Sequence, residues 1–544
     1  MNTRQLQTDK NQKLYHALLG ILLVCALAMM MLLSYWACKY SYYGAVDGRT
    51  RGVLVGDKTW AHIAVFLAAS LCAMGIDKVL MKKDKSQQEK ICLCTLIVTS
   101  VIAFILGVFY VCKNPYYPVG DQINTTAFAA YCRDGNFSML SIGGYVGMYQ
   151  QQKGLAILYE ILFTLFGDFN YRPAKILHVV WWILTILAGY GFLKLNTDRP
   201  VFRMLYCVMM LGCFPLLFYL PYIYGDVLSI SFGIILFYGV AAYEHSGQKR
   251  YIALASFAAG LAVLARKNTW IVLVAVAVYV LLVSLRKKKV RYLMAGTAIL
   301  LTAALSVKAV DVIYEVRSGY PSGVGIPSIL WIAMGLQETE GRAGVYNRYQ
   351  QATFTDYDCQ QELAAQQGKE YIRERLEEFS QDPGMAFNFF KNKVEGQWIE
   401  PMYAALESTE SFEEGAELSP VLESLYYGEL GRTIWKLTNY YQSILYLAGL
   451  MALVMLGILW WKKKEVPISL WLPWIAVFGG FLFSILWEAK SRYVFPYCVF
   501  MILYAPEGLY QTGLLLCKLP KLRKFKKSGH TQDKGEEASL RETA

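Results

Sequence analysis

One aspartate, Asp121, has both the chemistry and the setting of a catalytic carboxylate at a membrane surface. It follows a Pro-Val-Gly turn at 118–120, which follows a hydrophobic run from Ile91 to Cys112. A carboxylate held at the end of such a run could act as a general base toward a substrate hydroxyl. Aspartate is also a preferred N-cap residue, and residues 123–133 are typical of a helix lying on the membrane. The local sequence therefore leaves capping and catalysis both open.

Three cations occupy comparable positions at the ends of other hydrophobic runs. Arg172 precedes one run, whereas Arg266 and Lys267 close another. A guanidinium is well shaped for bidentate contact with phosphate, so these side chains could bind a phosphate at the membrane surface. The competing interpretation is that their long side chains reach lipid headgroups.

Two further charged residues lie at the same kind of boundary. Asp226 opens a hydrophobic run directly after Tyr224 and Gly225, and it could cap that helix or orient a cation. Arg492 follows Glu488 by four residues, a spacing that would pair them on one helix. For both residues a structural role and a role in binding remain open.

The composition indicates which elements must position these residues. The chain of 544 residues is 56% hydrophobic and only 17% charged, whereas soluble domains carry about 25% charged residues. Its hydrophobic residues form repeated runs of about 20, which indicate helices because only helices or closed barrels satisfy the backbone in lipid. We expect an all-α polytopic membrane protein with juxtamembrane helices and about twelve spans. The expected spans are 14–36, 60–80, 91–112, 175–194, 203–222, 226–244, 250–265, 268–286, 291–312, 436–460, 467–487 and 493–517.

One short hydrophobic segment, Gly154 to Gly167, decides the topology. Its length of about 14 residues is too short to span comfortably, and it contains Glu160. If it lies in the membrane interface, the basic clusters all fall on one side, as the positive-inside rule favours. We therefore expect both termini in the cytoplasm and the candidate residues on the extracytoplasmic face of a plasma membrane. The basic clusters are Arg4 to Lys13, 82–85, 194–203, 249–250, 286–289, 462–464 and 521–527.

This topology divides the chain into five regions. They are an N-terminal tail with two accessory helices (1–90), a membrane core with an outer loop at 113–174 (91–312), an extracytoplasmic, mainly helical insertion (313–435), C-terminal transmembrane helices (436–517) and a basic tail (518–544). Within the insertion, the hydrophobic pattern predicts an amphipathic helix over 358–379 and a second helix over 385–398. The residues at 381–384 should separate the two helices, because they include Pro and Gly.

The distribution of charge and of histidine and cysteine residues argues against nucleic acid, metal ions and cofactors as partners. The net charge of +12 lies largely in short loops and the tail, where it orients a membrane protein and contacts anionic lipids, so no nucleic-acid partner is expected. The five histidines are scattered, and most of the 12 cysteines lie inside hydrophobic runs. We therefore expect no metal site and no cofactor.

The motifs also follow a recognisable order along the chain. The span at 91–112 is followed by Gly120-Asp121-Gln122, helices near 123–133 and 150–167, and Arg172. Tyr224-Gly225-Asp226, the span end at 260–267 and the segment 492–496 come later. This order resembles the GT-C superfamily of integral-membrane glycosyltransferases, and within it the protein mannosyltransferase-like family 39 and its bacterial relatives. Members of that family usually have Asp-Glu where this chain has Asp121-Gln122.

The resemblance implies transfer of a sugar from a polyprenyl-phosphate donor to a hydroxyl of a lipid, glycan or protein acceptor, in cell-envelope glycan or glycoconjugate synthesis. Asp121 would deprotonate that hydroxyl, which attacks the anomeric carbon with inversion. The remaining candidates would hold the leaving phosphate (Arg172, Arg266, Lys267) or position the substrate (Tyr224, Asp226, Arg492). The alternatives are a transporter or lipid flippase, whose ionisable groups should lie nearer the bilayer midplane, and a non-catalytic scaffold presenting the insertion.

Overall fold

A computed structural model describes residues 3–45, 52–323, 325–464 and 466–518. Regular structure in this part of the chain is almost entirely helical, with two antiparallel pairs of short strands, β1–β2 (Tyr40–Tyr43, Val53–Gly56) and β3–β4 (Glu338–Thr339, Arg342–Ala343). The tail expected at 518–544 lies outside the described residues from 519 onward. The helices that form the long apolar segments are α1 (Thr3–Lys39), α2 (Thr59–Leu80), α3 (Lys85–Lys113), α7 (Arg172–Asn196), α10 (Asp226–Ser246), α12 (Trp270–Lys287), α13 (Arg291–Ser318), α20 (Glu429–Trp461) and α21 (Leu472–Leu486).

Nine helical segments within the described residues are long and apolar enough to cross a membrane. They coincide with nine of the expected spans, so the expectation of an all-α, multi-pass membrane protein is confirmed at that level. The expected number of twelve is not confirmed. Of the other three, the helix at 250–265 is continuous as α11 (Lys249–Ala265), but its 17 residues reach only about 26 Å.

The remaining two expected spans are interrupted at prolines. The prediction of one helix over 203–222 is wrong, because α8 (Pro200–Leu211) stops and α9 (Phe214–Phe218) starts anew with Pro215 in its first turn. Proline lacks a backbone N–H and disfavours helical geometry in the residue before it. The expected span 493–517 is likewise divided into α22 (Ser491–Met501), a turn at 502–504 and a helix at 505–518.

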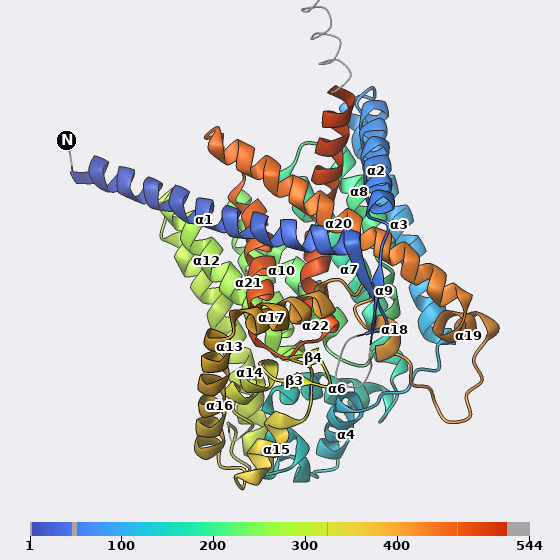
Figure 1. Ribbon diagram of the computed structural model, residues 1–544, viewed down its shortest axis with the longest axis vertical. Helices are drawn as coiled ribbons and strands as arrows, with labels where there is room; N and C mark the ends of the chain where they lie inside the picture. The colour runs from blue at the N-terminus through green and yellow to red at the C-terminus, as the bar shows by residue number, and fades with distance from the viewer. Residues whose placement is uncertain (1–2, 46–51, 324, 465, 519–544) are drawn as a thin grey trace, which may run out of the picture.

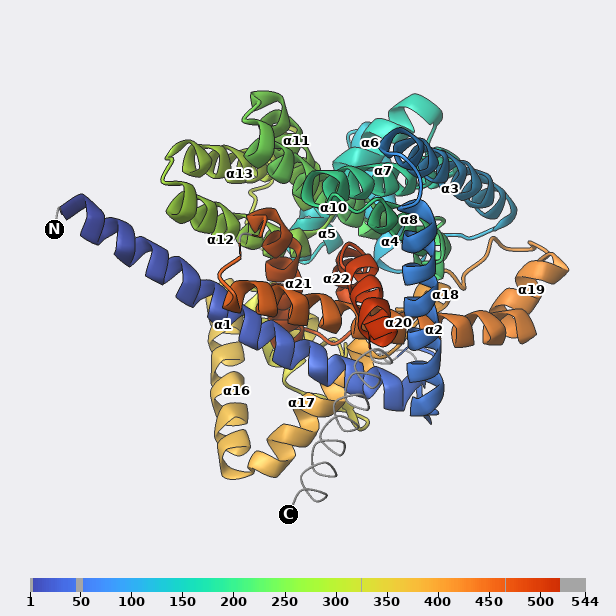
Figure 2. The same ribbon diagram turned by 90° about the horizontal axis from the view of Figure 1, so that it is seen from above.

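Helix α10 crosses the bundle of membrane helices from one end to the other, and it shows which charged residues lie at each end. Helix α10 lies in the middle of the bundle (Figure 2), packed against α7, α11 and α22. Gly239 of α10 would place a Cβ only 3.1 Å from the Cβ of Ala255, so a small residue permits this close helix contact. The 21 residues of α10 cover about 31 Å. Residues 226 and 266 therefore lie at one end, and the turn 246–249 lies at the other.

Three short helices lie at the end that carries Asp226. They are α4 (Asp121–Arg133), α5 (Tyr145–Met148) and α6 (Lys153–Phe166). Helices α4 and α6 pack against each other and lie low in the view of Figure 1, beside the lower end of α13. Helix α6 has 14 residues and is not among the helices long enough to cross. We call this end of the molecule the site end.

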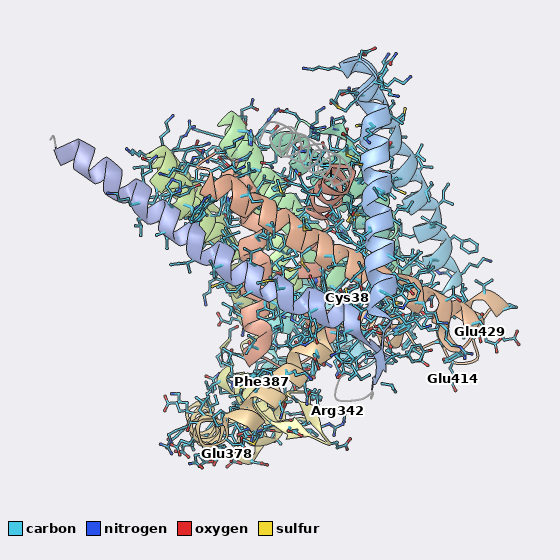
Figure 3. The ribbon with its side chains drawn as sticks, turned by 45° about the horizontal axis from the view of Figure 1, so that its top comes forward. Cys38, Arg342, Glu378, Phe387, Glu414 and Glu429 are labelled. Atoms are coloured by element: carbon cyan, nitrogen blue, oxygen red, sulfur yellow. The ribbon has the colours of Figure 1, made fainter. Side chains whose placement is uncertain are left out.

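The insertion continues from the site end. Its helices are α14 (Ile329–Gly335), α15 (Tyr349–Asp356), α16 (Gln361–Gln381), α17 (Pro383–Trp398), α18 (Ala405–Ser408) and α19 (Pro420–Tyr427). The side chain of Asp382 accepts a hydrogen bond from the backbone N–H of Met385 at 2.9 Å and caps α17, so the break falls at the predicted place. Figure 3 shows Glu378 and Phe387 on the α16–α17 pair, which projects below the membrane helices. Trp398 ties the pair to α21, because its Nε1 donates to Ser484 Oγ at 3.0 Å.

Candidate functional site

Asp121 is the first residue of α4, and its carboxylate is exposed. The N-cap of α4 is Gly120, whose φ of 60° favours glycine. The carboxylate of Asp121 accepts a hydrogen bond from the hydroxyl of Tyr145 at 2.9 Å. Asp121 is therefore placed where its charge favours the start of a helix, yet one of its oxygens is held by a side chain from a separate segment.

Tyrosines from several segments surround this carboxylate. Burial, and next the negative charge of Asp121, raises the pKa of Tyr145, Tyr224 and Tyr346. These phenols are consequently neutral hydrogen-bond donors at neutral pH. The ring of Tyr149 packs on that of Tyr145, with centroids 5.1 Å apart. The carboxylate of Asp121 therefore lies at the edge of a group of aromatic side chains, Tyr145, Tyr149, Tyr224 and Tyr346, which we call the aromatic wall.

A buried charge cluster lies behind Tyr224. Asp226 at the start of α10 pairs with Arg266 at the end of α11, and Arg492 Nε at the start of α22 lies 3.9 Å from the same carboxylate oxygen. Asp226 is 2% exposed and Arg492 is 7% exposed, so two guanidinium groups share one carboxylate in a site shielded from water. The second carboxylate oxygen of Asp226 and the Nε of Arg492 have no hydrogen-bond partner among the described residues.

Aromatic rings hold these guanidinium groups in place. Arg266 lies over the rings of Tyr224 and Tyr493, at 5.3 Å and 5.4 Å from the centroids. Arg492 lies 5.3 Å from the Tyr224 centroid and donates to the hydroxyl of Tyr222. Each guanidinium can gain from cation–π contact, especially away from water. Glu488 precedes α22, which begins only at Ser491, so the two residues do not lie four apart on one helix as expected.

The cluster borders a chain of adjoining cavities. The largest, of about 350 Å³, is lined by Gln151, Lys153 and Lys267. A second, of about 90 Å³, shares Gln151 and Lys267 with it and adds Tyr224 and Arg266. Lys267 donates to Ser328 Oγ at 3.2 Å and has no ion pair among the described residues, whereas Lys153 pairs with Asp311. Lys267 is thus a cation available to an anion in either cavity.

One predicted phosphate ligand lies apart from this group. Arg172 is exposed at the start of α7, lines none of these cavities and contacts neither Asp121 nor the buried cluster. Its backbone N–H donates to Asn170 Oδ1 at 3.3 Å. The structure brings five of the other predicted residues together around adjoining cavities, namely Tyr224, Asp226, Arg266, Lys267 and Arg492. Asp121 lies near this group, because its charge affects the pKa of Tyr224.

Several residues of the site were not foreseen from the sequence. Tyr145 reaches Asp121 from a Gly-rich segment, where a Cβ on Gly147 would lie 2.1 Å from a backbone oxygen; closely spaced glycines were the available signal of this tight packing. Trp331 and Trp487 stack with their centroids 5.9 Å apart and line the second cavity. These two tryptophans are far apart in the chain, and no spacing rule connects them.

Glu400 is a further buried acid near the site, and it is not one of the predicted site residues. Burial, with a smaller effect of Glu407, raises the pKa of Glu400 to about 8. Its carboxyl group accepts hydrogen bonds from the backbone N–H groups of Met402 and Ala404 at 2.7 Å and 2.6 Å, and from Ser491 Oγ at 2.8 Å. Since Ser491 precedes Arg492, Glu400 fixes the start of α22 relative to the insertion.

Comparisons with known proteins leave this site to be interpreted from its own geometry. No protein-family model, no curated protein and no solved structure matches the chain. Among the described residues, no group of three or more His, Cys, Asp or Glu side chains could hold a metal ion. The function must therefore be inferred from the carboxylate, the tyrosines and the cations of the site.

Proposed function

We propose that the protein is a membrane glycosyltransferase that moves a sugar from a polyprenyl-phosphate donor to an acceptor hydroxyl on the extracytoplasmic face. The observation that supports this most directly is the placement of an exposed carboxylate, Asp121, beside a buried pair of arginines. Tyr224 is close to both, since the negative charge of Asp121 raises its pKa and the guanidinium of Arg266 lies over its ring. A base and an anion site separated by one aromatic side chain fit a transfer with a phosphate leaving group.

In the proposed reaction, Asp121 takes the proton of the acceptor hydroxyl as the hydroxyl oxygen attacks the anomeric carbon. The bond from that carbon to the phosphate oxygen breaks, and the polyprenyl phosphate leaves with the electron pair. Arg266 and Lys267 stabilise the charge that develops on this phosphate. Asp226 holds Arg266 and Arg492 in place, and Tyr145 holds the carboxylate of Asp121 in position. The configuration at the anomeric carbon inverts.

The direct test replaces Asp121 by asparagine and measures sugar transfer from a panel of polyprenyl-phosphate sugars in detergent. We expect transfer to fall by about 100- to 10,000-fold, the range that a general base contributes, with donor-lipid binding retained. Asp134→Asn is the matched control, because Asp134 is an exposed aspartate at the other end of the same helix. Near-normal transfer by the Asp121→Asn variant would exclude Asp121 as the base. Counterflow of labelled substrate in proteoliposomes without any product would instead favour a transporter.

A further inference from the structure

A second large cavity lies at the end of the membrane helices opposite the site end. Its volume is about 350 Å³, and residues of α1, α12 and α20 line it together with Val466 and Trp471. Helix α12 has 18 residues and begins at Trp270, three residues after Lys267, so the cavity at its other end lies about 27 Å from the start of this helix. Figure 1 shows the C-terminal ends of α12 and α20 near the N-terminal half of α1, far from α4 and α6. We call it the basic cavity.

Four cations line the basic cavity, namely Arg286, Lys288, Lys463 and Lys464. Arg286 donates to the backbone oxygen of Val466 at 2.9 Å. Within the described residues, the three lysines make no ion pair, and no acidic side chain lines the cavity. Glu465, the chain neighbour of Lys464, lies outside the described residues; one carboxylate against four cations still leaves a net positive charge.

Neutralising helix ends does not account for these lysines. Cations are favourable near helix C-termini, and Lys288 and Lys463 follow the ends of α12 and α20. One terminal carbonyl group of each helix, however, accepts a backbone hydrogen bond, from Lys288 N–H to Ser284 at 2.8 Å and from Lys464 N–H to Leu459 at 2.9 Å. The three lysines are exposed, and their ammonium groups can reach a ligand in the cavity.

Aromatic side chains supply the other wall of the basic cavity. They are Tyr15, Trp460 and Trp471. Trp460 is fixed against α1, since a Cβ on Gly20 would lie 2.9 Å from its ring. Its Nε1 is buried without a hydrogen-bond partner among the described residues. Tryptophan and tyrosine favour the level of lipid headgroups, so the cavity combines cations with an amphipathic wall at that level.

We propose that the basic cavity binds the phosphate headgroup of an anionic phospholipid from the adjoining leaflet. Phosphate oxygens would contact Lys288, Lys463 and Lys464, and the glycerol and first acyl carbons would lie along Trp460 and Trp471. Basic pockets between membrane helices suit such headgroups, because each cation near an anionic leaflet adds to the affinity. This proposal stands whether or not the protein is a glycosyltransferase.

The test measures phosphatidylglycerol retained by the full-length protein after detergent exchange, with native mass spectrometry as the readout. The cavity variant combines Lys288→Gln, Lys463→Gln and Lys464→Gln. The matched control combines Lys82→Gln, Lys83→Gln and Lys85→Gln, which removes three exposed lysines from the α2–α3 turn. We expect the affinity for phosphatidylglycerol to fall by about 10- to 100-fold in the cavity variant and to change little in the control.

Three results would overturn the proposal. The first is equal loss of phosphatidylglycerol from the cavity variant and from the control, and the second is full retention by the cavity variant. The third concerns the source of the phosphate. If inorganic phosphate alone raises the unfolding temperature of the wild type as much as phosphatidylglycerol does, and the cavity variant loses both effects, the cavity takes a soluble phosphate compound instead of a lipid. Gel filtration of both variants checks that each remains folded.

Discussion

The two ends of the membrane bundle carry similar numbers of cations in opposite environments. At the site end, Arg266 and Arg492 are buried, share the carboxylate of Asp226 and lie between tyrosine rings. At the basic cavity, Lys288, Lys463 and Lys464 are exposed. Burying a charge is expensive unless it is paired, whereas an exposed lysine stays hydrated at little cost.

This difference distinguishes a buried, paired set of cations from an exposed, unpaired one. Paired, buried cations keep a fixed geometry, which is what stabilisation of a leaving phosphate requires. Exposed lysines adapt to whichever anionic headgroup is nearby and also favour the cytoplasmic side. The difference supports the two proposals, sugar transfer at the site end and lipid binding at the basic cavity, and three predictions probe that division.

The largest expected effect concerns the two faces of the membrane. A cysteine at position 134, in the exposed turn after α4, should be labelled from outside intact cells by a membrane-impermeant thiol reagent. A cysteine at position 248, in the exposed turn between α10 and α11, should be labelled only after permeabilisation. The positive-inside rule predicts this all-or-none pattern. The parent protein, with its own exposed Cys72, Cys94 and Cys112, supplies the background, and the reverse pattern would invert the proposed topology.

The next largest effect concerns the buried pair at the site end. Asp226→Asn leaves Arg266 and Arg492 without their shared carboxylate, and uncompensated buried charge costs about 3 to 5 kcal/mol. We expect a marked fall in the thermal unfolding temperature in detergent, together with loss of sugar transfer.

Asp168→Asn is the matched control for this variant. Asp168 also pairs with an arginine, Arg133, but their side chains are 38% and 28% exposed, and such pairs contribute only about 0 to 1 kcal/mol. Equal destabilisation by the two variants would contradict the distinction drawn between buried and exposed charge.

The sequence predicted the long helices and most of the charged residues of the site, because long apolar runs and charges at their ends are local features. It did not predict the break between α8 and α9, although Pro215 marks it, since hydrophobicity averaged over a run hides one missing N–H. It also did not predict that Arg492 lies beside Asp226, which is far from it in the sequence. Contacts between distant segments depend on helix packing, which no local spacing determines.

Arg172 and Tyr145 show in two ways that local sequence does not determine which side chains reach the site. Arg172 had the residue type and boundary position expected of a phosphate ligand, yet it lies exposed and apart from the cluster. Tyr145 gave no signal of its own, yet it is the residue whose hydroxyl contacts Asp121. Residue type indicates what a side chain can do, whereas the path of the loop decides whether it reaches the site.

The smallest of these effects tests whether Tyr145 positions the carboxylate. Tyr145→Phe removes one hydrogen bond to a charged group, worth about 1.5 to 3 kcal/mol, so transfer should fall by about 10- to 100-fold. Because Tyr145 contacts Asp121 and not the cation-lined cavities, the loss should appear in kcat, with KM for the donor lipid nearly unchanged. Tyr131→Phe is the control, because Tyr131 is an exposed tyrosine on α4 whose hydroxyl makes no hydrogen bond to the described part of the chain. A change confined to KM would mean that Tyr145 binds the donor instead, and the aromatic wall would then belong to the anion site and not to the base.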